Sequence, residues 1–222
     1  MLNGFFLVVA LCSAPQAQQM KSVFVLGDSI SMHYGPFLEE ALSGVFLYDR
    51  KRDDAGLSEV GVPAGENGGD SRMVLEYLKT MSSDPSFRPD ILLLNCGLHD
   101  IKRNLENNKE LQVSPGHYRE NLEKIYSISA AMGTQLIWVR TTPVVNTIHN
   151  KEGRQFYRYE DDLSKYNGIG DSVFRSRGVP IVDLYVFTKK LGPEVFVDHV
   201  HYDQKTRALQ AAFIAGFLQN FR

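Results

Sequence analysis

The sequence predicts an α/β fold: a three-layer α/β/α sandwich around a five-stranded parallel sheet. Short apolar runs alternate with segments of helical spacing along the chain. The central runs are apolar at every position, which is typical of strands covered on both faces by helices. The chain has 222 residues, 43% hydrophobic and 23% charged, and this length and composition suit one domain with a substantial core.

Five apolar runs are the predicted strands. In chain order they cover residues 22–26, 45–48, 91–94, 136–139 and 179–183. The first ends at Gly27 and the third lies between Pro89 and Gly97, so turn-forming residues bound both. Strands separated by helices pair in parallel through right-handed crossovers, which place helices on both faces of the sheet.

Helices are expected in the intervals. They cover 31–43, a segment after the polar stretch 52–69, the segment from Ser114-Pro115 to Gly133, about 159–177, and the segment from Asp203 to about Leu218. Ser114 and Pro115 are a helix cap followed by a first-turn proline. The helix from Asp203 is the last predicted element, and no strand is predicted after it.

The N-terminus predicts a secretory signal peptide over residues 1–17. No charged side chain precedes Lys21, and the apolar run Phe5–Leu11 is too short to span a bilayer. Small and polar residues follow this run and place cleavage near Ala17. The protein is therefore expected to be secreted or periplasmic.

Two alternatives for this segment are open: a buried N-terminal strand, or a lipoprotein anchored through Cys12, where the bulky Leu11 is an unfavourable neighbour. Removal of the leader leaves residues 18–222 as a single domain. Cys96 is then the sole cysteine, so the mature chain has no internal disulfide. Cys96 lies in an apolar run, where we expect it to pack as a small hydrophobic residue.

Charge and motif content exclude several function classes. The formal net charge is −2 and the sequence pI is about 6.3, which argues against nucleic acid as a partner. No apolar run reaches the length of about 18 residues that membrane insertion needs. Phosphate-loop, dinucleotide, HExxH and CxxC patterns do not occur, so neither a cofactor nor a metal is expected. The oligomeric state cannot be read from the sequence.

Chemically useful residues gather where the predicted strands end or helices begin. Four such segments cover 27–31, 67–71, 95–100 and 198–201. Loops at the carboxyl ends of parallel strands meet along one edge of the sheet, and ligands bind there. Together the segments supply a hydroxyl, an imidazole, a carboxylate and backbone N–H groups, which are the parts of a serine nucleophile site.

In order along the chain, these segments resemble the four blocks of the SGNH hydrolase family, also called the GDSL esterases and lipases. The first holds Gly-Asp before Ser29, the second holds Gly69, the third covers 97–100, and the fourth holds Asp198 and His201. The resemblance extends from about residue 22 to the last helix. It implies the flavodoxin-like SGNH hydrolase fold.

The resemblance also implies roles for these residues. Ser29 is expected to be the nucleophile, His201 the base and Asp198 the carboxylate that orients His201. The backbone N–H groups of Ser29 and Gly69 are expected to form the oxyanion hole. These roles match the acyl-transfer chemistry of a catalytic triad.

The third block departs from the family pattern at His99, where asparagine is usual. A neutral imidazole can also donate a hydrogen bond, so His99 is expected to contribute to the oxyanion hole. The alternative is that His99 only packs or caps its loop, and that Asn67 or Asn95 approaches the oxyanion instead.

Other polar residues are expected outside the site. His199 is interpreted as a loop or surface residue, and His33 either lines the pocket or lies on the surface of its helix. His33 is not assigned to the site. The charged cluster at 49–54 is interpreted as a solvated strand end.

The implied activity is that of a serine ester hydrolase that works through an acyl-enzyme. The expected substrate is a small-molecule or glycan ester, with a carbohydrate O-acetylesterase or another short-acyl esterase favoured. A lysophospholipase or thioesterase of the same family is the alternative. A non-catalytic binding module on the same fold is a further alternative, and the altered third block is its only support.

Overall fold

The alternating segments fold into one central parallel sheet. The computed structural model describes residues 19–52, 65–106 and 109–222. In chain order the strands are β1 (Ser22–Leu26), β2 (Leu47–Arg50), β3 (Ile91–Leu94), β5 (Gln135–Val139) and β7 (Ile181–Val182). Their order across the sheet is β2-β1-β3-β5-β7, and every neighbouring pair is parallel. The predicted five-stranded parallel sheet is confirmed.

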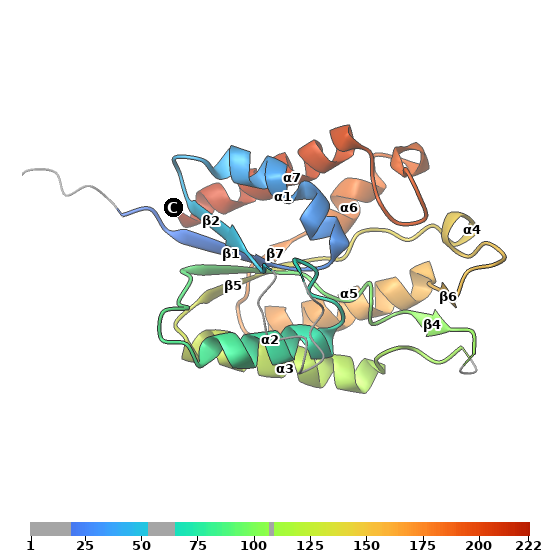
Figure 1. Ribbon diagram of the computed structural model, residues 1–222, viewed down its shortest axis with the longest axis horizontal. Coiled ribbons are helices and arrows are strands. Elements are labelled where there is room, and N and C mark those ends of the chain that lie inside the picture. The colour runs from blue at the N-terminus through green and yellow to red at the C-terminus, as the bar shows by residue number, and fades with distance from the viewer. Residues whose placement is uncertain (1–18, 53–64, 107–108) are drawn as a thin grey trace, which may run out of the picture.

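Helices cover both faces of this sheet. Figure 1 shows one layer above it and one below it. The upper layer holds α1 (Ser29–Leu42), α6 (Leu184–Lys189) and α7 (Gln204–Leu218); the lower layer holds α2 (Ser71–Ser82), α3 (Pro115–Ala131) and α5 (Glu160–Arg175). The three-layer sandwich predicted from the sequence is therefore confirmed.

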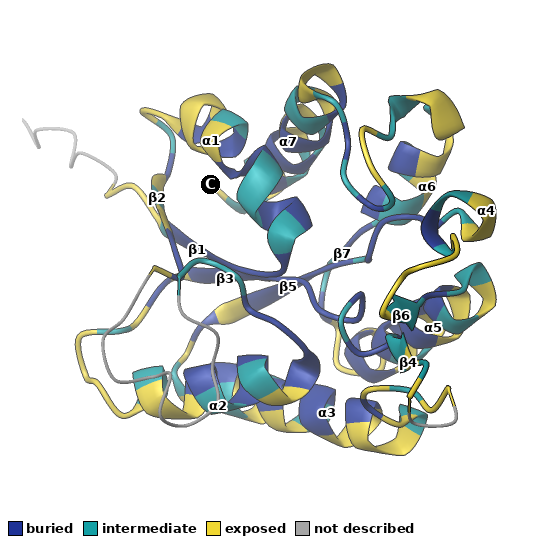
Figure 2. Cartoon of the chain, turned by 45° about the vertical axis from the view of Figure 1, so that its right-hand side comes forward, coloured by how far each residue is buried: buried dark blue, intermediate teal, exposed yellow. Residues whose placement is uncertain are grey.

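The middle of the sheet is the centre of the core. All four residues of β3 are buried, and Phe24 lies opposite Leu92, which in turn lies opposite Leu136. Figure 2 shows the inner strands buried, with exposed residues on the outer sides of the helices. Cys96 is fully buried and free, as expected for a small hydrophobic residue.

Several element boundaries differ from the predictions for local reasons. Helix α1 begins at Ser29, two residues earlier than expected, because the Asp28 side chain caps it. Strand β2 is displaced toward the C-terminus, to Leu47–Arg50. Strand β7 is shorter than predicted, since Pro180 has no N–H for the ladder and Asp183 caps α6.

The sequence did not predict several small elements of the structure. These are α4 (Asn146–His149), α6, the 3₁₀ turns η2 (Pro193–Val195) and η3 (Gln219–Phe221), and the antiparallel pair β4 (Arg103–Asn104) and β6 (Phe156–Tyr157). Figures 1 and 2 show β4, β6 and α4 lying close together. This pairing brings residues near 102 and 158 side by side.

The interpretation of the charged cluster as a solvated strand end is wrong for its centre. Arg50 is 4% exposed and Lys51 is 1% exposed. Arg50 Nη1 donates to the Ser31 carbonyl at 3.1 Å, and Lys51 Nζ donates to the Gly65 carbonyl. Buried charges need such partners, and here a loop distant in sequence supplies one of them. Residues 53–54 of the cluster lie outside the described residues.

The N-terminal leader is not tested by this structure, because residues 1–17 lie outside the described residues. Among the helices that are described, none combines the length and apolar character needed to cross a membrane.

Candidate active site

Ser29 lies directly after the first strand, as the first residue of α1. Asp28 caps this helix, and its side chain accepts a hydrogen bond from the Ile30 N–H at 2.9 Å. As a first-turn residue, Ser29 has a backbone N–H with no acceptor inside the helix. The cap therefore fixes the Ser29 hydroxyl at the carboxyl edge of β1, beside an N–H directed away from the helix.

The structure brings Ser29, His201 and Asp198 together, although Ser29 and His201 are 172 residues apart in sequence. Ser29 Oγ lies 2.8 Å from His201 Nε2, and His201 Nδ1 lies 2.7 Å from Asp198 Oδ2. The carboxylate accepts from Nδ1–H, so Nε2 can accept the serine proton. This is the hydrogen-bonded order that a serine nucleophile requires.

Asp198 is held as a carboxylate by its own loop. Its Oδ1 accepts from the N–H groups of Val200 and His201, both at 2.8 Å. Burial alone would raise its pKa, but these bonds and the bond from the His201 ring hold the pKa of Asp198 well below its usual range. An ionised Asp198 would stabilise the imidazolium that forms when His201 takes a proton.

Gly69 lies on a turn that touches the Ser29 loop. The Gly68 N–H donates to the Gly27 carbonyl at 2.8 Å, and a side chain at Gly68 would approach that same oxygen to 3.1 Å. Gly69 itself has φ +71°, a conformation that favours glycine. Its N–H donates to Asn67 Oδ1 at 2.9 Å, so a substrate oxygen would have to take over this hydrogen bond. The oxyanion role of Gly69 therefore stays a prediction.

His99 lies on the turn after β3 and is mostly buried. Burial, followed by the positive charges of Lys102 and Arg158, lowers its pKa to about 3. The ring is therefore neutral at physiological pH and carries one N–H, as an oxyanion donor of this type requires. Because β1 and β3 are parallel neighbours, the turn of His99 follows the same end of the sheet as Ser29.

The two asparagines considered as alternatives differ in their contacts. Asn95 Nδ2 donates to the Val139 carbonyl at 2.9 Å and to Thr141 Oγ1 at 3.2 Å, so its amide joins the loops after β3 and β5. Asn67 uses its carbonyl oxygen to accept the Gly69 N–H. Asn95 is therefore already engaged as a donor, whereas Asn67 stays open as an alternative to His99.

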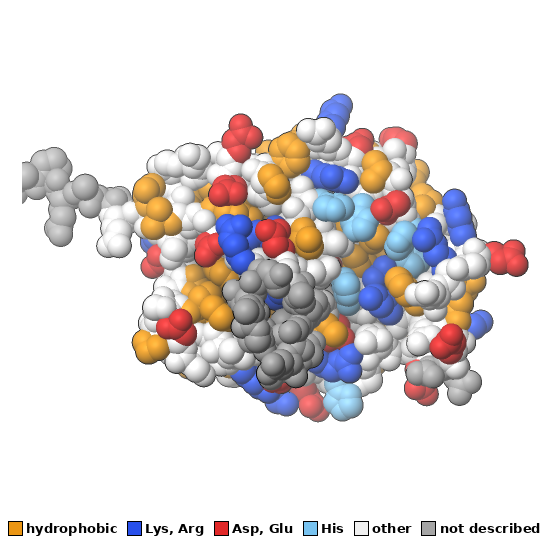
Figure 3. Space-filling model, in the orientation of Figure 1, with side chains coloured by type: hydrophobic (Ala, Val, Ile, Leu, Met, Phe, Trp, Pro, Cys, Tyr) orange, Lys and Arg blue, Asp and Glu red, His pale blue; other side chains and the backbone are white. Residues whose placement is uncertain are grey.

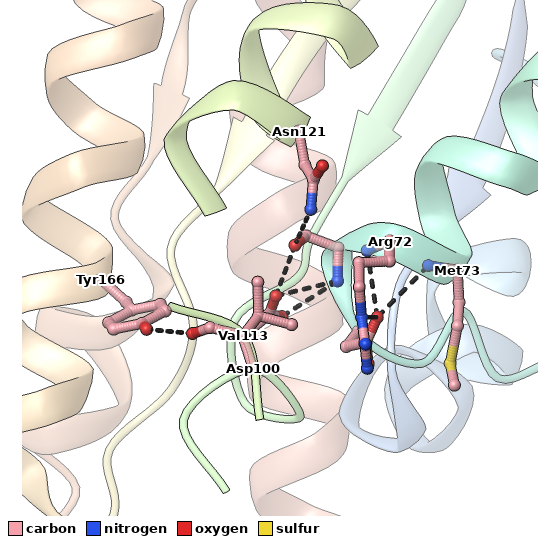
Figure 4. A network of polar contacts seen from close by, with 8 residues as sticks. Arg72, Met73, Asp100, Val113, Asn121 and Tyr166 are labelled. Atoms are coloured by element: carbon pink, nitrogen blue, oxygen red, sulfur yellow. Dashed lines mark hydrogen bonds and ion pairs between the residues drawn. The ribbon is translucent and has the colours of Figure 1, made fainter. Parts of the chain in front are cut away.

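The turns that carry Gly69 and His99 are joined by a buried network around Asp100 (Figure 4). Asp100 accepts from the Ser71 N–H at 3.0 and 3.1 Å and from Ser71 Oγ at 2.5 Å. Asn121 on α3 donates to that same hydroxyl at 2.9 Å. Burial raises the pKa of Asp100 to about 7, against the effect of these hydrogen bonds. Asp100 thus supports the oxyanion side of the site without being a reacting group.

His33 was not assigned to the site, but it packs directly against the triad. Its ring centroid lies 4.5 Å from that of His201, and its Nδ1 is buried without a hydrogen-bond partner. Burial, together with the charge of His201, lowers the pKa of His33. Its position one helical turn after Ser29 is the sequence signal that indicates this contact.

His199 lies in the loop before Val200, as one of its two interpretations has it, and it is half-buried rather than fully on the surface. Its ring centroid lies 4.6 Å from that of His149 and 6.4 Å from that of His201. Its Nδ1 is buried and unpaired. His149 comes from α4, a helix that the sequence did not predict, and no spacing rule links it to the fourth block. His201, rather than His199, holds the position next to Ser29.

A separate groove of about 490 Å³ lies between the segment after β5 and the segment 188–196. Pro143, Val144 and Phe196 contribute to its mostly apolar walls, and none of the triad residues lines it. Phe196 packs on Tyr202, whose hydroxyl donates to the Pro143 carbonyl at 3.2 Å. The groove therefore adjoins the loop of Asp198 and His201 without including the reacting groups.

Solved structures with the same fold are numerous. A lipase/acylhydrolase from Enterococcus faecalis superposes with a TM-score of 0.66 at 16% identity, covering 91% of this chain and 97% of its own. The acetyl xylan esterase AlAXEase gives 0.65 at 15% identity, covering 89% and 99%. Est24, a carbohydrate acetylesterase from Sinorhizobium meliloti, gives 0.60 at 13% identity, covering 91% and 100%. At these identities the similarity shows a shared fold.

Membership of a family follows from the sequence profile. A comparison with curated proteins gives no match. The profile of the GDSL-like lipase/acylhydrolases, in contrast, matches residues 23–214, which span the sheet and the segments that carry Ser29, Asp198 and His201. The chain therefore belongs to the GDSL-like lipase/acylhydrolase family and is a carboxylic ester hydrolase.

Proposed function

We propose that the protein hydrolyses esters through the triad Ser29, His201 and Asp198. The observation that carries this proposal is the unbroken hydrogen-bond line of 2.8 Å from Ser29 Oγ to His201 Nε2 and 2.7 Å from His201 Nδ1 to Asp198 Oδ2. Ser29 Oγ attacks the ester carbonyl while its proton passes to His201. The carbonyl oxygen becomes an oxyanion, and Asp198 stabilises the imidazolium.

The rest of the cycle uses the same groups. His201 gives its proton to the alcohol as the ester C–O bond breaks, which leaves an acyl group on Ser29 Oγ. Water then attacks this acyl-enzyme, His201 takes the water proton, and the acid leaves as the serine hydroxyl is restored. The N–H groups of Ser29 and Gly69, together with His99, are the proposed donors to both oxyanions.

Replacement of the nucleophile tests this proposal. Ser29→Ala should abolish hydrolysis of 4-nitrophenyl acetate, since no hydroxyl is left to be acylated. Ser127→Ala, on the exposed face of α3, is the matched control and should retain the wild-type rate. Labelling by an aryl phosphonate should add one adduct, located on Ser29. Activity retained in Ser29→Ala would place the nucleophile elsewhere, and failure of the wild type to react would favour a binding module.

For the substrate we propose short acyl groups on a carbohydrate. Support comes from the predicted export of the chain and from two fold neighbours that are themselves described as an acetyl xylan esterase and a carbohydrate acetylesterase. A fold does not select a substrate, so this support is indirect. A series of 4-nitrophenyl esters of increasing chain length, measured beside acetylated glycans, tests it. Highest kcat/KM on long acyl chains would instead favour a lysophospholipase or thioesterase.

We also propose that residues 1–17 direct export and are removed. Support is restricted to the sequence, where an uncharged apolar leader ends in small residues. Mass spectrometry of the protein from its native host should give an N-terminus near residue 18 in the exported fraction. An intact N-terminus on protein retained inside the cell would contradict export.

A further inference from the structure

Two cations beside the proposed oxyanion hole have no carboxylate partner. Lys102 is half-buried and Arg158 is 3% exposed. Among the residues that the structure describes, no carboxylate oxygen lies within 4.0 Å of either side chain. A desolvated cation without a counter-charge is costly, and such groups in proteins are normally paired.

A single aromatic ring holds both cations. Lys102 Nζ lies 5.0 Å from the centre of the Phe156 ring, and the Arg158 guanidinium carbon lies 4.8 Å from it. The pairing of β4 with β6 brings these residues together, since Lys102 precedes β4 and Phe156 begins β6. Cation–π contact offsets part of the lost hydration, but it leaves both charges unneutralised.

Neutral groups occupy part of the Arg158 side chain. Its Nε donates to the Leu98 carbonyl at 2.6 Å, and its Nη1 donates to His149 Nε2 at 3.0 Å. Burial, together with the charge of Arg158, lowers the pKa of His149 to about 4, so this imidazole is a neutral acceptor. Burial also lowers the pKa of Lys102. The two positive charges are thus stabilised here by neutral groups: the Leu98 carbonyl, the His149 imidazole and the Phe156 ring.

The nearest acidic groups are used for other purposes. Asp28 acts on Arg158 only at a distance and caps α1. Asp70 and Asp100 act on Lys102, but Asp70 pairs with Arg72 at 2.6 Å and Asp100 bonds to Ser71. None of these acids is therefore a direct partner of Lys102 or Arg158. Figure 3 shows histidine and cationic side chains gathered together on one face of the molecule.

The two charges lie on the His99 side of Ser29. The Leu98 carbonyl that binds Arg158 belongs to the peptide leading into His99, and Lys102 lies three residues later on the same turn, where its N–H donates to the His99 carbonyl at 3.3 Å. The charges of both residues act on the His99 ring. A substrate whose carbonyl oxygen meets His99 would therefore place its neighbouring groups within their field.

We propose that Lys102 and Arg158 form a subsite for an oxyanion, a carboxylate or a phosphate, carried by the ester substrate. The inference rests on the proposed esterase activity and specifies its substrate as an ester bearing negative charge near the scissile bond. Lys102, the more exposed of the two, makes the direct ion pair. The buried Arg158 adds a second positive charge beside Lys102. It also positions the turn of His99 through its hydrogen bond to the Leu98 carbonyl. An acidic sugar and a phosphorylated alcohol share this chemistry.

Matched esters test the subsite. We compare 4-acetoxybenzoate, which carries a carboxylate, with its neutral methyl ester, and add 4-acetoxyphenyl phosphate as a third substrate. Lys102→Met should raise KM for the two anionic esters on the order of 10-fold, the effect of one charge-assisted contact, with kcat much less affected. KM for the methyl ester should change far less. The relative rates of carboxylate and phosphate esters distinguish an acidic sugar from a phosphorylated alcohol.

Two controls make the comparison specific. Lys124→Met removes a lysine from the exposed face of α3 and should leave all three KM values unchanged. Higher ionic strength should weaken the preference for anionic esters in the wild type and have little effect in Lys102→Met.

Arg158→Lys is a second variant of the subsite. It keeps the positive charge but loses the two hydrogen bonds to the Leu98 carbonyl and His149, so its thermal unfolding is measured alongside its kinetics. The result for Lys102→Met is decisive where Arg158→Lys folds poorly.

The outcomes separate this subsite from the esterase proposal. Ser29-dependent hydrolysis in which Lys102→Met affects charged and neutral esters equally would overturn the subsite and leave the esterase standing. Absence of hydrolysis of every ester would overturn the esterase. In that case calorimetric binding of 4-hydroxybenzoate to the wild type and to Lys102→Met still decides: equal affinity, or no binding, overturns the subsite.

Discussion

The two sides of Ser29 are built differently. On the acid–base side, one short loop supplies both partners, with Asp198 and His201 three residues apart and bonded at 2.7 Å. On the oxyanion side, Gly69 and His99 come from separate turns. Ser71 and Asp100, which join these turns, are 29 residues apart in sequence. A local hydrogen-bond pattern fixes the first side, whereas tertiary contacts fix the second.

The difference also concerns which groups already have partners. Asp198 accepts three hydrogen bonds, so its negative charge is stabilised within its own loop. On the other side the Gly69 N–H is bonded to Asn67, and Lys102 and Arg158 have no carboxylate among the described residues. The acid–base side is thus assembled before substrate binds, while the oxyanion side gains its remaining partners from the substrate. Three predictions test this contrast.

The largest effect is expected on the acid–base side. Asp198→Asn should lower kcat by about 10³–10⁴, because a neutral amide no longer fixes the Nδ1–H tautomer of His201 and lacks the charge that stabilises the imidazolium. KM for a neutral acetate ester should change little, since Asp198 bonds Nδ1 of His201 and Ser29 bonds the other ring nitrogen. Steady-state kinetics on 4-nitrophenyl acetate measure both values.

Asp161→Asn, an exposed acid in the first turn of α5, provides the matched control and should behave as the wild type. A fall in kcat of less than about 10-fold in Asp198→Asn would mean that the carboxylate does not orient His201. The acid–base side would then be less completely assembled than its geometry indicates.

A smaller loss is expected on the oxyanion side. His99→Ala should lower kcat by about 10²–10³, the effect of removing one oxyanion donor. The ring is neutral at pH 7 because its pKa is about 3, so the loss should not depend on pH between about 6 and 8. Turnover of 4-nitrophenyl acetate at three pH values checks both statements.

His99→Asn sharpens this prediction, since it introduces the amide donor that the family usually has at this position. It should restore at least part of the turnover that His99→Ala loses. Equal activity in wild type and His99→Ala would show that His99 does not donate to the oxyanion, and would favour Asn67 as the donor instead.

The contrast between the two sides also explains what the sequence could predict. Strand β3 was predicted with its observed bounds because a run such as Ile91–Leu94 is unambiguous when both flanks are turn residues. The spacing of Asp198 and His201 and the Gly-Asp before Ser29 are short local patterns. Such patterns indicate the acid–base side from the sequence alone.

The oxyanion side contains contacts that no local pattern encodes. Arg158 lies in a segment without periodicity, and only the β4–β6 pairing brings it to Leu98 and Phe156. The burial of Arg50 and Lys51 depends likewise on partners distant in sequence. Charged residues in a sequence are interpreted as solvated by default, and only tertiary structure shows which of them are buried.

The smallest effect concerns the link between the two oxyanion turns. Burial raises the pKa of Asp100 from 3.8 to about 7, so the folded state holds its proton more tightly than the unfolded state does. Its stabilising contribution is therefore complete below pH 3.8 and is lost as the pH rises through about 7. Between pH 5.5 and 8 the wild type should lose about 2 kcal/mol of unfolding free energy from this group.

Asp100→Asn removes the titration while keeping a side-chain oxygen to accept the Ser71 N–H. Urea unfolding at pH 5.5 and pH 8 should show a fall in stability for the wild type that is about 2 kcal/mol larger than the fall for this variant. Equal falls in the two proteins would mean that Asp100 is ionised throughout and that its bonds from Ser71 outweigh its burial. The turns of Gly69 and His99 would then be joined by a permanent charge, while Lys102 and Arg158 would still lack a carboxylate partner among the described residues.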